Sequence, residues 1–83
     1  MNTWGLSGTT TGAVGALSDQ QRAVLRCLAR GLADHEIARV LAISQEQVAG
    51  EVVEILRVLD LRDRMAAVVF AHETGIIRLP LPR

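Results

Sequence analysis

Few side chains in this sequence could perform covalent or metal chemistry. The sequence has one cysteine, Cys27, and two histidines, His35 and His72. A thiol beside an imidazole could form a nucleophile pair, but no further residue would orient these two groups. The two histidines lie far apart in the chain, and neither has a Cys, Asp or Glu at the spacing of metal ligands. We therefore expect no catalytic residue, no metal site and no cofactor, and we interpret the chain as a protein that is not an enzyme.

Cys27 has no second cysteine with which it could form a disulfide within the chain. It lies in an apolar helical pattern, which predicts a buried, reduced thiol that packs as a small hydrophobic side chain; a reactive thiol is the alternative. The N-terminus lacks a basic region followed by a long apolar run. No stretch reaches the roughly 18 apolar residues that span a bilayer. We therefore expect a cytoplasmic protein with no membrane partner.

All nine basic residues are arginines, and two groups of them have a spacing that could hold phosphate groups. One group recurs at every fourth residue and the other is a cluster: Arg22, Arg26 and Arg30, then Arg57, Arg62 and Arg64. Cationic contacts to phosphates supply much of the affinity of nucleic-acid-binding proteins, although a charged stripe is also typical of a solvated helix face. The formal net charge is zero and the pI is about 6.7. Because a dedicated nucleic-acid binder is usually basic, the composition argues mildly against that class.

The elements that position these side chains begin at Ser18. The segment "SDQQ" has the pattern of a capping box, in which the Ser18 hydroxyl accepts from the Gln21 N–H and the Gln21 side chain reaches back. Apolar residues at helical spacing follow, and Gly31 suits the left-handed residue that ends a helix. We therefore predict a first helix between Ser18 and Gly31. Its inward face is formed by Val24, Leu25, Leu28 and Leu32.

A second, short helix is predicted to begin at Asp34, whose carboxylate can serve as the N-cap. Its inward residues are Ile37, Ala38 and Leu41. The segment "AIS" then forms a tight connection, and Ser44 opens a third helix with a second capping box, "SQEQ". This helix runs to about Leu59. Asp63 can cap a fourth helix, "RMAAVVFAHET", which stops at Gly75.

The fold class that we expect is all-α, with four helices around one core. Hydrophobic residues make up 49% of the chain but aromatic residues only 2%, which favours packed helices. Residues 1–16, rich in Gly and Thr, predict a flexible leader, and residues 78–83 predict an extended tail because they contain two prolines. The expected core residues are Leu25, Leu28, Ile37, Leu41, Val48, Val52, Ile55 and Leu59.

The order and spacing of these segments resemble the LuxR/FixJ-type (GerE-like) helix-turn-helix domain. The resemblance is carried by "LSDQQRAVLRCLARGLADHEIARVLAISQEQV", "ILRVLDLRDR" and "AHETGII", within residues 17–77. It implies a four-helix domain over these residues, with a helix-turn-helix made by the second and third helices. In that family the third helix enters the major groove of DNA and the fourth often supports dimerisation. Such domains usually lie at the C-terminus of transcription regulators, so the resemblance implies a standalone regulator or a fragment of a larger one.

The third helix departs from the family pattern at positions that would meet DNA. Ala49 and Val58 stand where Lys is common, and Glu51 stands where His is common. With three glutamates and one arginine, this helix has a net charge of −2, which disfavours contact with phosphates. In the first helix the family favours glutamates where this chain has Gln21 and Ala23. The DNA-reading helix is therefore interpreted as degenerate.

Two hypotheses follow from the resemblance and these departures. By resemblance, the chain is a small regulator of transcription that binds duplex DNA, here weakly or in dependence on a partner. Alternatively, it is an interaction or dimerisation module that has lost specific DNA binding and pairs as a homodimer or as a heterodimer with a related regulator. The DNA-facing candidates are Gln45, Gln47, Ala49, Gly50, Val53, Arg57, Arg62 and Arg64. The dimer candidates, which follow i, i+3, i+4, i+7 spacing on the fourth helix, are Met65, Val68, Val69 and His72.

Overall fold

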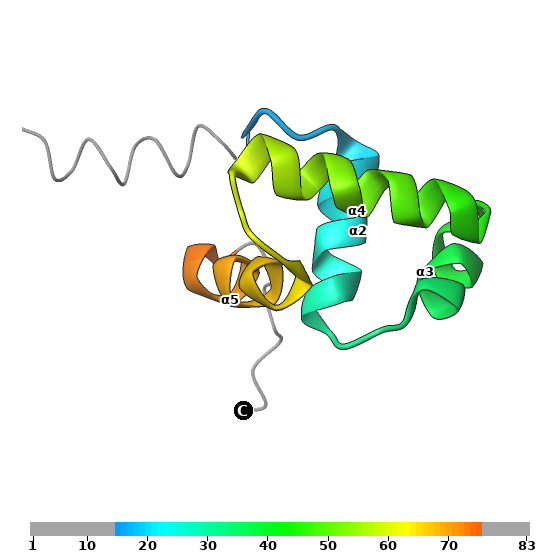
Figure 1. The fold of residues 1–83 in the computed structure, drawn as a ribbon. Helices are drawn as coiled ribbons and strands as arrows, with labels where there is room; N and C mark the ends of the chain where they lie inside the picture. Colours follow the sequence, from blue (N-terminus) through cyan, green and yellow to red (C-terminus); the bar gives the residue numbers. More distant parts are fainter. Residues whose placement is uncertain (1–14, 76–83) are drawn as a thin grey trace, which may run out of the picture.

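The computed structural model describes residues 15–75, which form four α-helices and no strand (Figure 1). The helices are α2 (Asp19–Ala29), α3 (Asp34–Leu41), α4 (Gln45–Leu59) and α5 (Arg64–Thr74). The predicted all-α fold class and the order of its helices are thus confirmed. Residues 1–14 and 76–83 lie outside the described part, so the leader over residues 1–16, the domain bounds of 17–77 and the tail over residues 78–83 stay predictions.

α2 and α4 begin with the capping boxes that the sequence predicts. Ser18 Oγ accepts from the Gln21 N–H at 3.0 Å, while the Ser18 N–H donates to Gln21 Oε1 at 2.9 Å. The same reciprocal pair joins Ser44 and Gln47, with 3.0 Å in both directions. Each box satisfies two N–H groups that have no partner within the helix. These local bonds therefore fix where α2 and α4 start.

The start of α3 differs from the prediction. Asp34 does not cap this helix: it occupies the first helical position, and Ala33, which has no side-chain acceptor, precedes it. The Ala33 N–H donates instead to Glu36 Oε1 at 2.7 Å. Asp34 has another role, because its carboxylate pairs with Arg64 at the start of α5. The predicted cap of α5 is confirmed, since Asp63 Oδ1 accepts from a first-turn N–H at 2.8 Å.

The helices α2, α3 and α4 end in the same way, with one residue in the left-handed conformation. Gly31 has φ 84°, as its position predicts, whereas Ala42 and Asp60 have φ 59° and 57°. After each of these residues, the next N–H bonds to the carbonyl five residues earlier, which is the Schellman arrangement. The left-handed conformation costs a residue with a Cβ roughly 1–2 kcal/mol. The turn between α3 and α4 therefore carries strain at Ala42.

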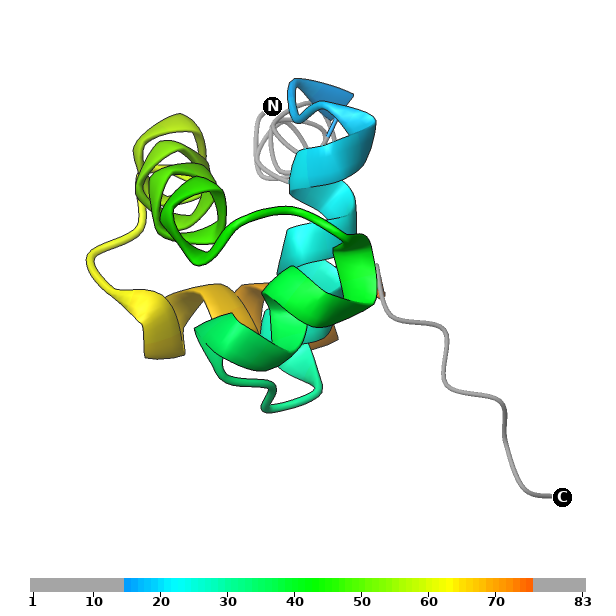
Figure 2. The same ribbon diagram turned by 90° about the vertical axis from the view of Figure 1, so that its right-hand side faces the viewer.

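α2 lies at the centre of the domain, and α3, α4 and α5 all pack against it (Figure 1, Figure 2). Every expected core residue is buried except Leu41, which is half-buried and packs against the edge of the core. The prediction that Leu41 is a core residue was therefore wrong in degree: Leu41 is the last residue of α3 and borders an open space between α2 and α3. Ala67 and Ala71 form the inward face of α5 and are fully buried. Their small side chains let α5 approach α2 closely.

Candidate nucleic-acid interface

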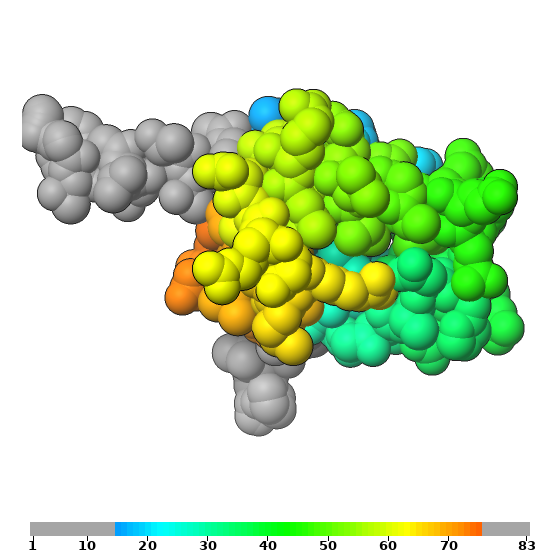
Figure 3. Space-filling model, in the orientation of Figure 1, coloured from blue at the N-terminus to red at the C-terminus, as the bar shows by residue number. Residues whose placement is uncertain are grey.

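α3 and α4 form a helix-turn-helix whose connection is the predicted "AIS" segment, residues 42–44. α4 has 15 residues and buries one face, made of Val48, Val52, Ile55 and Leu59. Because an α-helix turns once in 3.6 residues, the opposite face of α4 points to solvent. Figure 3 shows α4 as an exposed surface beside the segment that leads into α5. The DNA-facing candidates that lie exposed on α4 are Gln45, Gln47, Ala49, Gly50, Val53 and Arg57.

This outer face of α4 presents few groups that could bind base edges. Ala49 and Gly50 have no side-chain donor or acceptor, and Val53, which is 66% exposed, offers only methyl groups. Gln47 uses its Oε1 to accept from the Ser44 N–H at the start of the helix. An amide that binds adenine in the bidentate way needs both its oxygen and its nitrogen. Of the Gln47 amide, only the NH₂ group therefore remains for DNA while the helix stays capped; the other amide on this helix belongs to Gln45, which is also exposed.

The one arginine on α4 is paired within the helix. Arg57 Nε donates to Glu54 Oε1 at 3.2 Å, and Arg57 also makes an ion pair with the second oxygen of Glu54. This hydrogen bond lowers the pKa of Glu54 and raises the pKa of Arg57 from their usual values. The carboxylate thus stays ionised beside the guanidinium and offsets its charge. The Arg57 side chain is largely exposed and that of Glu54 is partly exposed, so the pair is weak and a phosphate could compete for the arginine.

Of the other two candidate arginines near α4, Arg64 is also engaged. Its Nη2 lies 2.7 Å from Asp34 Oδ1 and 3.4 Å from the carbonyl oxygen of Leu32. The contact with Asp34 is an ion pair without a well-aligned hydrogen bond, and the same carboxylate oxygen is buried with no hydrogen-bond partner among the described residues. Arg64 therefore ties the start of α5 to the start of α3. Arg62 is exposed and makes no ion pair among residues 15–75.

The arginine stripe of α2 lies on a different side of the domain. Arg22 is held by the Leu17 carbonyl at 2.8 Å and by Asp19, whereas Arg26 and Arg30 are exposed and have no ion pair in the described part of the chain. The core face of α2 packs towards α4, so this stripe points away from α4. The stripe therefore does not join Arg57 of α4 in one basic surface.

The dimer candidates on α5 do not share one environment. Met65 is 66% exposed and Val69 is 47% exposed, so both present apolar surface to solvent. Val68 packs partly against the core. The Nε2 of His72 lies 3.2 Å from the carbonyl oxygen of Ala29, at the C-terminal end of α2. Met65 and Val69 are therefore the apolar candidates that are placed to meet another molecule, while His72 is exposed but bound to the end of α2.

Residues 15–71 match the model of a family described as bacterial regulatory proteins of the luxR family. The match extends from before α2 into the last turns of α5. The chain belongs to the luxR family. It is also 40% identical over 58 residues to a protein of Haemophilus influenzae described as a nitrate/nitrite response regulator protein homolog. The alignment covers 70% of this chain but 28% of that protein, so the chain spans little more than a quarter of the relative's length.

One departure from the luxR-family pattern has a structural role that the sequence alone did not suggest. Glu51 does not face outward with Val53; it is half-buried at the edge of the α4–α2 contact. Its carboxylate accepts from Gln20 Nε2 at 2.7 Å and from Gln21 Nε2 at 3.1 Å. Glu51 and Gln21 occupy the two positions at which the resemblance led us to expect His and Glu, so both departures meet in one hydrogen bond.

The position of Glu51 could have been recognised from helical spacing. It lies three residues after Val48 and four residues before Ile55, and both of these residues are in the core. Residues at these spacings are neighbours on a helix surface, so Glu51 belongs beside the core face and not on the outer face. Its carboxylate therefore joins α4 to α2, and its negative charge lies to one side of the DNA-facing candidates.

Cys27 of this luxR-family domain is a free, buried thiol, as predicted. Burial raises the pKa of the Cys27 thiol above its usual value, and the positive charges of Arg30 and Arg26 offset only part of this effect. Because the thiolate is the reactive form, a raised pKa keeps this side chain unreactive near neutral pH. No three of the His, Cys, Asp and Glu residues within 15–75 come together as a metal ion would need. No helix in the same range is long and apolar enough to cross a membrane.

Proposed function

We propose that this chain is a cytoplasmic regulator of transcription whose α4 approaches duplex DNA but discriminates weakly between bases, so that tight specific binding depends on a partner. Membership of the luxR family supports the regulatory role, as does the likeness to a response regulator protein homolog. The proposal that base discrimination is weak rests on the outer face of α4. It offers Ala49, Gly50 and Val53 where base-reading side chains would lie, and its arginine is paired with Glu54.

The size of the missing contribution follows from the energies of base contacts. One good bidentate contact gives roughly 1–3 kcal/mol of discrimination, and specific sites are bound about 4–10 kcal/mol more tightly than other DNA. Two or three absent contacts therefore remove most of the difference between a specific and a non-specific site. Among residues 15–75, Arg62 is the one unpaired arginine at this end of α4, and each phosphate contact changes the slope of log K against log salt by about −0.9. We expect a shallow slope, of about −1 to −3.

The substitution Ala49→Lys tests this proposal on the exposed face of α4. The new ammonium should strengthen binding to generic duplex DNA by about tenfold at low salt and steepen the salt slope by about one, because one more phosphate contact releases one more counterion. Glu73→Gln is the matched control: it makes the net charge more positive by the same amount, but on the exposed side of α5. If both variants gain equal affinity for DNA, the gain comes from net charge and not from α4. The proposal that α4 approaches DNA would then be wrong.

Selection of binding sites from a random pool of duplexes, at physiological salt and with the unaltered chain, gives the second test. We expect no defined motif and only non-specific affinity, with Kd in the range of about 10⁻⁴–10⁻⁶ M. Recovery of a single motif bound at about 10⁻⁸ M or better, the range of specific binders, would contradict the proposal. Recognition would then come from the DNA shape or from residues outside α4.

Pairing of two chains through α5 is the second candidate function, and exposed apolar surface favours it. Met65 and Val69 lie one turn apart on α5 and are exposed, and apolar surface of this kind often marks a partner site. Val69→Glu should shift a dimer to monomer in sedimentation equilibrium, because a carboxylate would be buried at the interface. The exposed Glu73→Gln again serves as a control. A chain that is monomeric at millimolar concentration, or whose mass Val69→Glu leaves unchanged, would exclude this candidate.

A further inference from the structure

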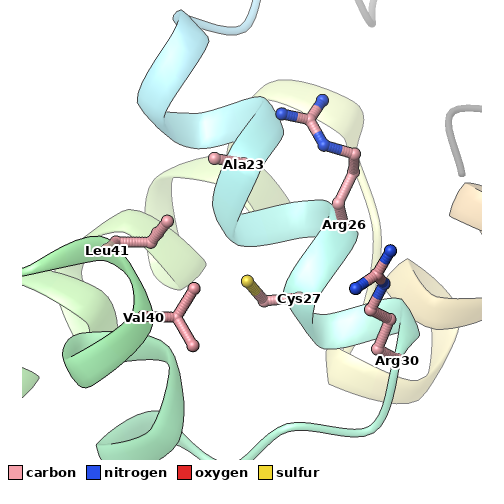
Figure 4. Close-up of a pocket in the computed structure, with 6 residues that line it drawn as sticks. All are labelled: Ala23, Arg26, Cys27, Arg30, Val40 and Leu41. Atoms are coloured by element: carbon pink, nitrogen blue, oxygen red, sulfur yellow. The ribbon is translucent and has the colours of Figure 1, made fainter.

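A small hollow lies between α2 and α3, at the edge of the core and away from the outer face of α4. It has a volume of about 210 Å³ and is lined by Ala23, Arg26, Cys27, Arg30, Val40 and Leu41. Figure 4 shows the Cys27 sulfur and the Val40 side chain on facing sides of this space, while Arg26 and Arg30 extend along α2. Val40 is apolar, yet 63% of it is exposed. No described part of the chain therefore covers the Val40 side of the hollow.

The chemistry of the hollow limits what it can hold. Small-molecule sites usually measure roughly 300–1,000 Å³, so this space suits one apolar side chain better than a cofactor or metabolite. Arg26 and Arg30 have no carboxylate partner within the described residues, and both lie one helical turn apart at its edge. The matching surface therefore combines an exposed apolar side chain with an unpaired carboxylate on the same face.

The outer face of α4 has both features. Val53 is exposed, and Glu46, which lies seven residues earlier and so on the same side of the helix, is exposed and has no ion pair in residues 15–75. Gly50 lies between them and adds no side chain that would hold another molecule away. The acidic charge that disfavours DNA on this face is complementary to the arginines beside the hollow.

The hollow and this face cannot meet within one molecule. α2 and α4 pack against each other through their core faces, so the arginine side of α2 and the Val53 side of α4 point in opposite directions. A helix with its side chains is about 10–12 Å across, which places the two surfaces about 20 Å apart. The same separation argues against one duplex reaching both surfaces.

We infer that a second copy of this chain docks the outer face of its α4 on the α2–α3 hollow, with Val53 inserted beside Val40 and Glu46 paired with Arg26 or Arg30. The contact is heterologous, because it joins two different surfaces, and it therefore leaves one free surface of each kind at the ends of an assembly. It also covers α4. Self-association and DNA binding by α4 thus exclude each other, which is a property beyond the proposed function.

Two single substitutions separate the two sides of this contact. Arg26→Glu alters the hollow and leaves α4 intact, whereas Val53→Arg alters α4 and leaves the hollow intact; both residues are exposed, so the fold should tolerate the changes. In sedimentation velocity over a concentration series, each variant alone should associate at least tenfold more weakly than the unaltered chain. Arg39→Glu makes the same charge change on exposed α3, outside the hollow, and should behave as the unaltered chain.

Mixing the two variants gives the decisive result. The intact α4 of Arg26→Glu can dock on the intact hollow of Val53→Arg, so the mixture should form one-to-one pairs that neither variant forms alone. Binding of Arg26→Glu to generic duplex DNA should equal or exceed that of the unaltered chain, since this residue lies away from α4. Three results would overturn the inference: unchanged association of both variants, no association in the mixture, or a loss of DNA binding in Arg26→Glu, which would make the arginine a phosphate contact. The proposed function has its own test, in Ala49→Lys, and can fail separately.

Discussion

Truncation of Ile55 to alanine should remove a large part of the stability of the domain. Ile55 is fully buried on the core face of α4 and is among the largest side chains with no exposed surface. The three lost carbon atoms correspond to about 2.4 kcal/mol of transfer free energy, at roughly 0.8 kcal/mol for each group. The cavity left behind adds to this, which gives the range of about 2–5 kcal/mol measured for such truncations. A domain of about 60 residues has roughly 3–9 kcal/mol of stability, so this change removes a large part of it.

Urea and thermal unfolding, followed by far-ultraviolet circular dichroism, measure this loss directly because the described part of the chain is helical. Ile55→Ala should lower the midpoint of thermal unfolding by about 8–40 °C, at roughly 4–8 °C for each kcal/mol in a domain of this size. Val53→Ala on the same helix is the matched control, since Val53 is exposed and its truncation should change the stability by less than about 0.5 kcal/mol. An Ile55→Ala domain within 1 kcal/mol of the unaltered one would show that the core face of α4 has been placed wrongly.

Three further changes test the turn and the polar contacts. Ala42→Gly should raise the free energy of unfolding by up to about 1 kcal/mol in urea denaturation, because glycine relieves the left-handed conformation at φ 59°; a loss would mean that flexibility of the unfolded chain outweighs this relief. Glu51→Ala should cost about 1 kcal/mol, and a double-mutant cycle with Gln20→Ala should give a coupling of at least about 0.5 kcal/mol if their 2.7 Å bond contributes. Arg57→Gln should return the lowered pKa of Glu54 towards its usual value in an NMR titration. Because the pair depresses this pKa in the folded state, its small contribution is present above the usual glutamate pKa and is lost as pH falls through the lowered one; an unchanged pKa would exclude the pair in solution.

Local interactions explain why much of the fold could be predicted. A capping box needs only residues three positions apart, so Ser18 with Gln21 and Ser44 with Gln47 are visible in the sequence and recur in the structure. The apolar periodicity likewise identifies the buried face of each helix. Asp34 shows where this reasoning fails: its sequence position suits a cap, but the competing partner, Arg64, lies thirty residues later. No local rule could rank the two interactions.

Part of the candidate interface could likewise be predicted from the sequence, and part could not. The residue types on α4, with Ala49, Gly50 and Val53 between two glutamates, already indicated a surface poor in groups that bind bases, because this depends on which side chains share a helix face. Whether the arginines near α4 are free to bind phosphates depends instead on their contacts with other side chains in the folded domain. The sequence grouped Arg57, Arg62 and Arg64 together, yet the structure pairs two of them with carboxylates.

What the sequence alone determined is the set of helices, their buried faces and the membership of the luxR family, because each follows from short-range spacing and from the order of segments along the chain. Tertiary structure decided how the polar side chains are used. It turned Glu51 towards Gln20 and Gln21 on α2, and it placed Arg26 and Val53 on opposite sides of the domain. These outcomes depend on how one helix is rotated against another. That rotation is set by the packing of the whole core, in which each side chain contacts residues far away in the sequence.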